Sequence, residues 1–297
     1  MNFPDLDIQP RAKTGGASDD TTHVPRDPAV AVAYGRSKLP TVITDIIIDH
    51  LHDDPLTLSA CGLVSSSWIH TVRFHRFRAV GMRTYHGIAG LYNLLQHGSP
   101  ALGPYVQSLS LIDSPSQTSK TEPQIEFILS KLTCLRTLRL AHFILTPAHA
   151  QRLFAALPRS IEALEINQMD IPSLGHLILL WTSLPRLRSF TNLEMLYIRS
   201  PEISDELCGT PLPLKISLSE LHLRWSVRHA DVLARWLVSR DIPAQFRRCS
   251  LYVNAMNPPA YAVTIMRALG PSLESLELFV HTNHDEWDDA DSAMSCE

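Results

Sequence analysis

Residues 135–140 read LRTLRL, and their spacing, apolar-x-x-apolar-x-apolar, recurs along the chain. The alternation of apolar side chains in each copy predicts a short strand with one buried face. Phe77-x-x-Val80 predicts a leading, atypical strand 29 residues before the first full copy. The middle apolar residues of the seven full copies are separated by 25 to 32 residues: Leu109, Leu138, Leu164, Leu196, Leu221, Cys249 and Leu276.

Helical patterns lie between these strands. Pro123, Thr146-Pro147, Pro172 and Pro258-Pro259 each precede apolar residues spaced by three and four, and residues 230–238 show the same spacing without a proline. A unit of one strand and one helix cannot bury its apolar side alone, so the units are expected to stack. The sequence therefore predicts an α/β fold with parallel strands on one face and helices on the other.

This organisation resembles the irregular leucine-rich repeats of fungal-type F-box proteins, over residues 77–284. The family's Asn, three residues after the last strand Leu, is matched only by Asn254, so a regular curvature is not expected. A doubly wound α/β domain is the alternative. The short strands, the shared template and the absence of a Gly-rich phosphate loop argue against it.

A different apolar pattern occupies residues 38–76. Leu39-Pro40 and Asp54-Pro55 each begin an expected helix, because proline fits the first turn and Asp is a common N-cap. Ser65 to Ser67 interrupt the pattern before a third helix. The apolar residues of the three helices are Ile43, Ile46, Ile47 and Leu51, then Leu56, Leu58, Cys61, Leu63 and Val64, then Trp68, Ile69, Val72 and Phe74.

This segment resembles an F-box through Leu39-Pro40, Ile43-x-x-Ile46-Ile47, Leu63-Val64 and Trp68, although Val42 stands where many members carry Glu. The resemblance implies binding to the Skp-type adaptor of a cullin-RING ubiquitin ligase. The residues that match the family's contact positions in kind are Leu39, Pro40, Ile43, Ile47, Leu51, Leu58 and Trp68. A generic three-helix segment is the alternative, and Ile47 or Trp68 then belongs to its internal core.

The residues between the template positions are expected to point outward, because side chains alternate along a strand. The candidate substrate-binding residues on this face are Arg139, Glu165, Tyr197, Arg199, His222, Arg224 and Tyr252. The last five are expected to form one patch about 10 Å across, since neighbouring strands lie about 4.8 Å apart. Such a patch suits a peptide segment, either acidic or phosphorylated. Alternatively, this face is ordinary surface, and loops or the acidic tail bind the substrate.

Charge and composition exclude several classes. The net charge is −4, and the six acidic residues at 285–297 account for more than that, so the body lacks the strong positive field that nucleic acid binding needs. No apolar stretch reaches the ~18 residues of a membrane span, and residues 1–13 lack a signal-peptide core. The five cysteines show no CxxC spacing, which favours the cytosol or nucleus and predicts no metal site. Residues 1–37 and 285–297 are expected to be disordered.

Catalytic motifs are absent from the sequence: it contains no GxGxxG, GxxxxGK, GxSxG or HExxH, and no cofactor is predicted. The chain is therefore interpreted as a non-enzymatic substrate receptor of an SCF-type ubiquitin ligase, made of an F-box and a repeat domain. A repeat scaffold that works without a ligase is the alternative. A small α/β hydrolase or transferase is the third interpretation.

Overall fold

The computed structural model describes residues 39–98, 102–112, 118–192, 196–200, 218–223, 233–238, 246–254, 260–269 and 272–281. The chain divides into two units, Met1–Pro40 and Thr41–Glu297, and the helices and strands named below lie in the second. The predicted N-terminal arm (1–37) and acidic tail (285–297) fall outside the described residues. The described part is an α/β protein with a mostly parallel sheet, as the sequence predicts at this level.

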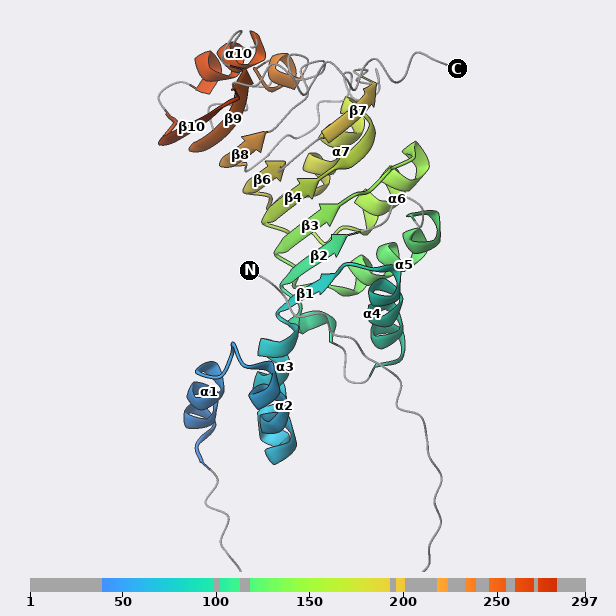
Figure 1. Cartoon of the computed structure of the whole chain (residues 1–297), viewed down its shortest axis with the longest axis vertical. Helices are drawn as coiled ribbons and strands as arrows, with labels where there is room; N and C mark the ends of the chain where they lie inside the picture. The colour runs from blue at the N-terminus through green and yellow to red at the C-terminus, as the bar shows by residue number, and fades with distance from the viewer. Residues whose placement is uncertain are drawn as a thin grey trace, which may run out of the picture. The chain divides into compact units, whose positions relative to one another are not determined.

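Eight strands form the main sheet, and their order in the sheet follows their order in the chain (Figure 1). Every neighbouring pair is parallel. The strands are β1 (Ala79–Met82), β2 (Ser108–Ile112), β3 (Thr137–Ala141), β4 (Ala163–Asn167), β6 (Ser189–Asn192), β8 (Glu220–Leu223), β9 (Arg248–Asn254) and β10 (Ser275–His281).

One apolar row crosses this sheet in register. Its members are Val80, Leu109, Leu138, Leu164, Phe190, Leu221, Cys249 and Leu276. Six of the eight are predicted template residues, and Val80 belongs to the predicted leading strand. The spacing recognised in the sequence is therefore the spacing at which the chain returns to the sheet.

The prediction for Leu196 was wrong. Phe190 takes its place in the row, and Leu196 lies in a second sheet of two parallel strands, β5 (Met169–Ser173) and β7 (Leu196–Ser200). Gln168, which joins β4 to β5, has a φ of 45°, in the left-handed region. His142, at the equivalent position four residues after its row residue, has a φ of 63°.

The start of each strand is held by a repeated backbone bond. The carbonyl oxygen of Arg78 accepts from the N–H groups of both Gln107 and Ser108, at 2.9 and 2.8 Å. The equivalent two-donor arrangement recurs at the carbonyls of Gln107, Arg136, Glu162, Arg188, Ser219 and Arg247. Backbone bonding thus sets the register of consecutive strands independently of side-chain identity.

Helices pack against the sheet through its apolar rows, and α4 to α7 lie to one side of the strands (Figure 1). Four of the helices that pack against the sheet are α4 (Tyr85–His97), α6 (Pro147–Ala156), α7 (Leu174–Ser183) and α10 (Ala260–Leu269). The fifth, α5 (Thr118–Lys131), begins five residues before Pro123, which lies inside it. Residues 233–238 are also helical. Thr146 is the N-cap of α6: its Oγ1 accepts from the N–H of His149 at 3.2 Å.

The segment before β1 contains the three predicted helices, α1 (Thr41–Asp49), α2 (Pro55–Val64) and α3 (Ile69–Phe77), with a short 3-10 turn at Ser66–Trp68. The carboxylate of Asp54 caps α2 by accepting from the N–H groups of Leu56 and Thr57. These helices share a separate small core of Ile48, Leu58, Cys61 and Val72.

Candidate protein-binding surfaces

Helix α1 is fixed to the neighbouring helices along one side. Thr44 and Ile48, one turn apart, are buried. Asp45 and Asp49 both bond to α3: Oδ1 of Asp45 accepts from Oγ1 of Thr71 at 2.6 Å, and Oδ1 of Asp49 lies 2.7 Å from Nε2 of His75. The helical period then forces the remaining apolar residues of α1 away from this core.

The result is a set of exposed apolar side chains on α1 and α2. Its members, with their exposed fractions, are Ile43 (44%), Ile46 (48%), Ile47 (38%), Leu56 (82%), Leu63 (90%) and Val64 (68%). Val42, at the position where the F-box pattern has Glu, is 68% exposed as well. We call the six residues the helical apolar set. Scattered single exposed apolar residues are ordinary, but six on two short helices make this set a candidate binding surface.

The predicted adaptor contacts differ in how far their side chains are exposed. Ile43 and Ile47 are exposed, and Leu51 and Trp68 are half-buried against the small core. Leu58 is only 1% exposed, so its assignment as a surface contact was wrong: it belongs to the core. Leu39 and Pro40 are exposed and lie at the end of the first unit. Their contact with the adaptor remains a prediction from the sequence.

Ile46, Leu56, Leu63 and Val64 were not among the predicted contacts, although for Ile46 the sequence contained a signal. Once Ile48 is taken as the inward residue of α1, a step of two positions places Ile46 on the opposite side. The sequence interpretation grouped Ile43, Ile46, Ile47 and Leu51 as the apolar residues of this helix and left out Ile48, the isoleucine that lies in the core.

The outward face of the main sheet carries a row of polar residues, one on each of seven strands. We call it the polar column: Ser110, Arg139, Glu165, Thr191, His222, Ser250 and Glu277. The predicted members Arg139, Glu165 and His222 are in place. Thr191 occupies the position that had been predicted for Tyr197.

Cross-strand contacts link the polar column in two places. Nε of Arg139 lies 3.0 Å from Oε1 of Glu165. Farther along, Nδ1 of His222 lies 2.7 Å from Oγ of Ser250, whose hydroxyl donates to Oε2 of Glu277 at 2.8 Å. Because the single hydroxyl proton goes to Glu277, Nδ1 of His222 is the donor to Ser250. In neutral His222 the other ring nitrogen, Nε2, is then an acceptor.

The five-residue patch predicted around Tyr197 is not formed as expected. Tyr197 and Arg199 belong to β7 in the two-stranded sheet, whereas His222 belongs to β8 in the main sheet. Arg224 and the side chain of Tyr252 lie outside the described residues.

Arg199 already has an acidic partner. Its Nε lies 2.9 and 3.0 Å from the two carboxylate oxygens of Asp170 on β5, and its Nη2 lies 2.8 Å from Oδ2. Hydrogen bonding to Asp170 raises the pKa of Arg199 above its usual value. A phosphate or acidic peptide would have to displace this carboxylate, so the pair weakens the case for an acidic ligand at Arg199.

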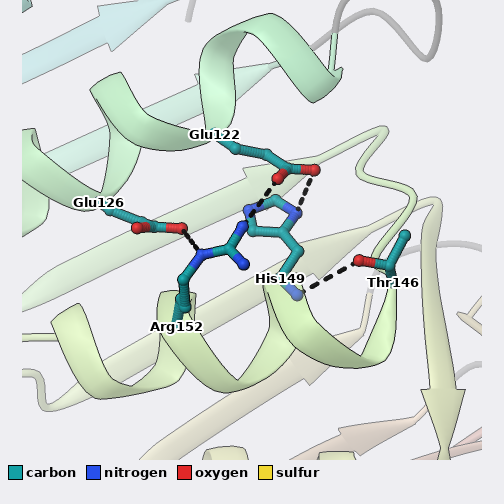
Figure 2. A network of polar contacts seen from close by, with 5 residues as sticks. All are labelled: Glu122, Glu126, Thr146, His149 and Arg152. Carbon is teal, nitrogen blue, oxygen red and sulfur yellow. Dashed lines mark hydrogen bonds and ion pairs between the residues drawn. The ribbon is translucent and has the colours of Figure 1, made fainter.

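A separate polar cluster joins helix α5 to helix α6 (Figure 2). Glu122 contacts two residues of α6: Oε1 lies 3.0 Å from Nδ1 of the fully buried His149, and Oε2 lies 3.0 Å from Nη2 of Arg152. Nε of Arg152 also donates to Glu126 at 2.9 Å. All four side chains are engaged with one another, so the cluster is a structural link between consecutive helices.

Within the described ranges no three His, Cys, Asp or Glu side chains gather closely enough to hold a metal ion. None of the helices in that part of the chain is long and apolar enough to cross a bilayer. Comparison with known proteins finds no family model that matches the chain and no curated protein that matches it significantly.

Proposed function

We propose that this protein is a substrate receptor of an SCF-type ubiquitin ligase. In this proposal α1 to α3 are an F-box that binds a Skp-type adaptor, and the parallel sheet with its helices is an irregular leucine-rich-repeat domain that binds a protein substrate. The protein itself then performs no chemistry and brings the substrate to the ligase.

The helical apolar set is the observation that carries the proposal. A core of four buried residues cannot cover the apolar side chains of three helices, and Leu56 and Leu63 are more than four-fifths exposed. Each such side chain gains about 1.5–3 kcal/mol on full burial, which favours a helical protein partner over solvent. A Skp-type adaptor is a partner of this kind, and the resemblance of residues 38–76 to an F-box points to it.

Substrate binding is assigned to the outward face of the main sheet, around the polar column. It carries charges of both signs, at Arg139, Glu165 and Glu277, so the proposed ligand is a folded protein surface or a mixed-charge segment. Tyr197 and Arg199 are not part of this proposed site.

The contacts of Ser250 support the non-enzymatic assignment. A serine nucleophile needs its hydroxyl to donate to a histidine base. Here the hydroxyl donates to Glu277 instead, and Ser250 is only 5% exposed. Although His, Ser and Glu lie side by side, their order is wrong for acyl transfer.

Co-purification tests the adaptor assignment. Wild-type protein is expected to recover a Skp-type adaptor and a cullin, and the double variant Ile47→Asp/Leu63→Asp to lose at least about 100-fold in adaptor affinity. Leu94→Asp on α4 is a control outside the three helices, because Leu94 is exposed to about the same extent as Ile47 (42% against 38%). Unchanged adaptor binding by a double variant that melts like wild type would reject the surface. A wild-type protein that binds other partners but neither ligase subunit would favour the scaffold interpretation.

Proximity labelling followed by pulldown tests the substrate surface. The variant His222→Ala/Glu277→Ala is expected to capture candidate substrates at least about tenfold more weakly than wild type, whereas Tyr197→Ala is expected to capture them normally. The reverse result would move the site to the two-stranded sheet.

A further inference from the structure

Strand β10 ends the main sheet, and its inward face is much less covered than that of the strand before it. On β9 the inward residues Cys249 and Leu251 are 1% and 0% exposed. On β10 the corresponding Leu276 and Leu278 are 39% and 45% exposed, and Val280 is 55% exposed. Among the described residues, β10 pairs only with β9, so its outer edge also presents unpaired backbone groups.

Charge argues against the C-terminal segment as the cover for this edge. Residues 282–297 contain six acidic residues and no Lys or Arg. Glu274 and Glu277 lie at or on β10 itself. Pairing an acidic segment along this strand would place like charges together, which is unfavourable.

A head-to-tail contact between β10 and the first strand of another copy is also disfavoured. Strand β1 has four residues, whereas β10 has seven. A contact between two different edges would leave a free β1 and a free β10 at the ends and would propagate into an open chain of copies. Pairing β10 with itself uses the whole strand and closes after two copies.

We propose that β10 is a dimerisation edge, on which the β10 strand of a second copy pairs antiparallel about a two-fold axis at Leu278. This register joins all seven residues of each strand and keeps the inward faces of both sheets on one side. Leu276 lies opposite the partner's Val280, and Leu278 opposite its own copy. Glu277 lies opposite the partner's Phe279, so the two Glu277 carboxylates do not face each other.

The two main sheets then form one continuous sheet across the axis, and the apolar row that begins at Val80 is completed by the second copy. The contact is one strand wide, which is small for a permanent dimer, so its dissociation constant is expected in the micromolar range, roughly 1–100 μM. The inference is independent of the proposed ligase function.

Disulfide cross-linking tests the register. In full-length protein with Cys134, Cys208 and Cys296 changed to Ser, Leu278→Cys is expected to form a disulfide-linked dimer under mild oxidation, because residues opposite each other on the axis are within disulfide reach. Leu94→Cys, on α4, is the control and is expected to remain monomeric. Stronger cross-linking by Glu277→Cys or Phe279→Cys than by Leu278→Cys would overturn the register.

Sedimentation equilibrium tests the dimer itself. Wild-type protein is expected to associate in the micromolar range and Leu278→Lys to weaken association at least about tenfold, while Leu94→Lys leaves it unchanged. Deleting residues 282–297 is expected to leave the association intact. A wild-type monomer at 100 μM would overturn the proposal, and dimerisation only after the deletion would identify the C-terminal segment as the occupant.

Discussion

The three-helix segment and the parallel sheet use the same apolar residue types in opposite ways. In the sheet, each residue of the row from Leu109 to Cys249 is at most 1% exposed, since each strand is covered by its neighbours and by helices. In α1 to α3 the buried apolar residues are Ile48, Leu58, Cys61 and Val72, and the helical apolar set remains in contact with solvent. The difference follows from size, because small units bury a smaller fraction of their surface.

Exposure therefore separates residues that stabilise the fold from residues available for binding. An apolar side chain inside the sheet contributes to unfolding free energy. An exposed apolar side chain on α1 or α2 contributes little to folding and is available to contribute to association. The first prediction below tests that division directly, and the later ones compare the sheet region with the helical segment by other measurements.

The largest difference in stability is expected between Leu138 and Leu63. Leu138→Ala removes a fully buried side chain from the middle of the sheet and should lower the unfolding free energy by about 2–5 kcal/mol. Leu63→Ala removes a side chain that is 90% exposed and should change it by less than about 0.5 kcal/mol. Urea denaturation of the purified variants gives both values. Similar losses at the two positions would contradict the division.

The apolar row was largely predictable from sequence, and its single failure has a physical reason. Two neighbouring segments near residue 190 are candidates for the strand. Leu193-x-x-Leu196-x-Ile198 matches the template, whereas the strand that lies in the main sheet has Phe190 followed by Asn192. Asn192 is buried (3% exposed), and a search for apolar residues passes over it. Both segments form strands, since the second sheet needs its own buried residues, Leu196 and Ile198.

The candidate sites were less predictable than the fold. The polar column follows from strand alternation, and that rule placed Arg139, Glu165 and His222 on it. By contrast, the pairing of Arg199 with Asp170 depends on the two-stranded sheet, which brings together residues 29 positions apart. The positive φ of Gln168, which precedes that sheet, has no sequence signal as strong as a glycine would give.

Cysteine alkylation compares the two cores by a second measurement. Burial raises the pKa of the Cys249 thiol to about 12, so almost no reactive thiolate exists at pH 8. Iodoacetamide should therefore modify the exposed Cys134 at least about 100-fold faster than Cys249. Cys61, in the smaller core, is expected to react at an intermediate rate through local opening. Peptide mass spectrometry over time measures all three, and equal rates for Cys61 and Cys249 would argue against a weaker helical core.

The cluster between α5 and α6 offers a smaller effect on the sheet region. Glu122→Ala removes the carboxylate that faces the buried His149 and should lower the unfolding free energy by about 1–3 kcal/mol. Glu126→Ala is the matched control: it removes only a contact to Arg152, whose side chain is half-exposed, and should cost less than about 1 kcal/mol. Equal losses of stability for the two variants in thermal unfolding would mean that the contact between Glu122 and His149 does not stabilise the fold.

The smallest effect is expected at the cap of α2. Hydrogen bonds from the hydroxyl and then the N–H of Thr57 lower the pKa of Asp54 in the folded protein. A carboxylate with a lowered folded pKa stabilises the fold above its unfolded pKa of 3.8, and this contribution is lost as the pH falls through the folded value. Asp54→Asn keeps an oxygen that accepts from the helix N–H groups but cannot titrate. The Tm difference between wild type and Asp54→Asn is therefore expected to favour wild type at pH 6 and to shrink below pH 3.8. A difference that stays constant with pH would show that the charge of Asp54 adds nothing to its role as a cap.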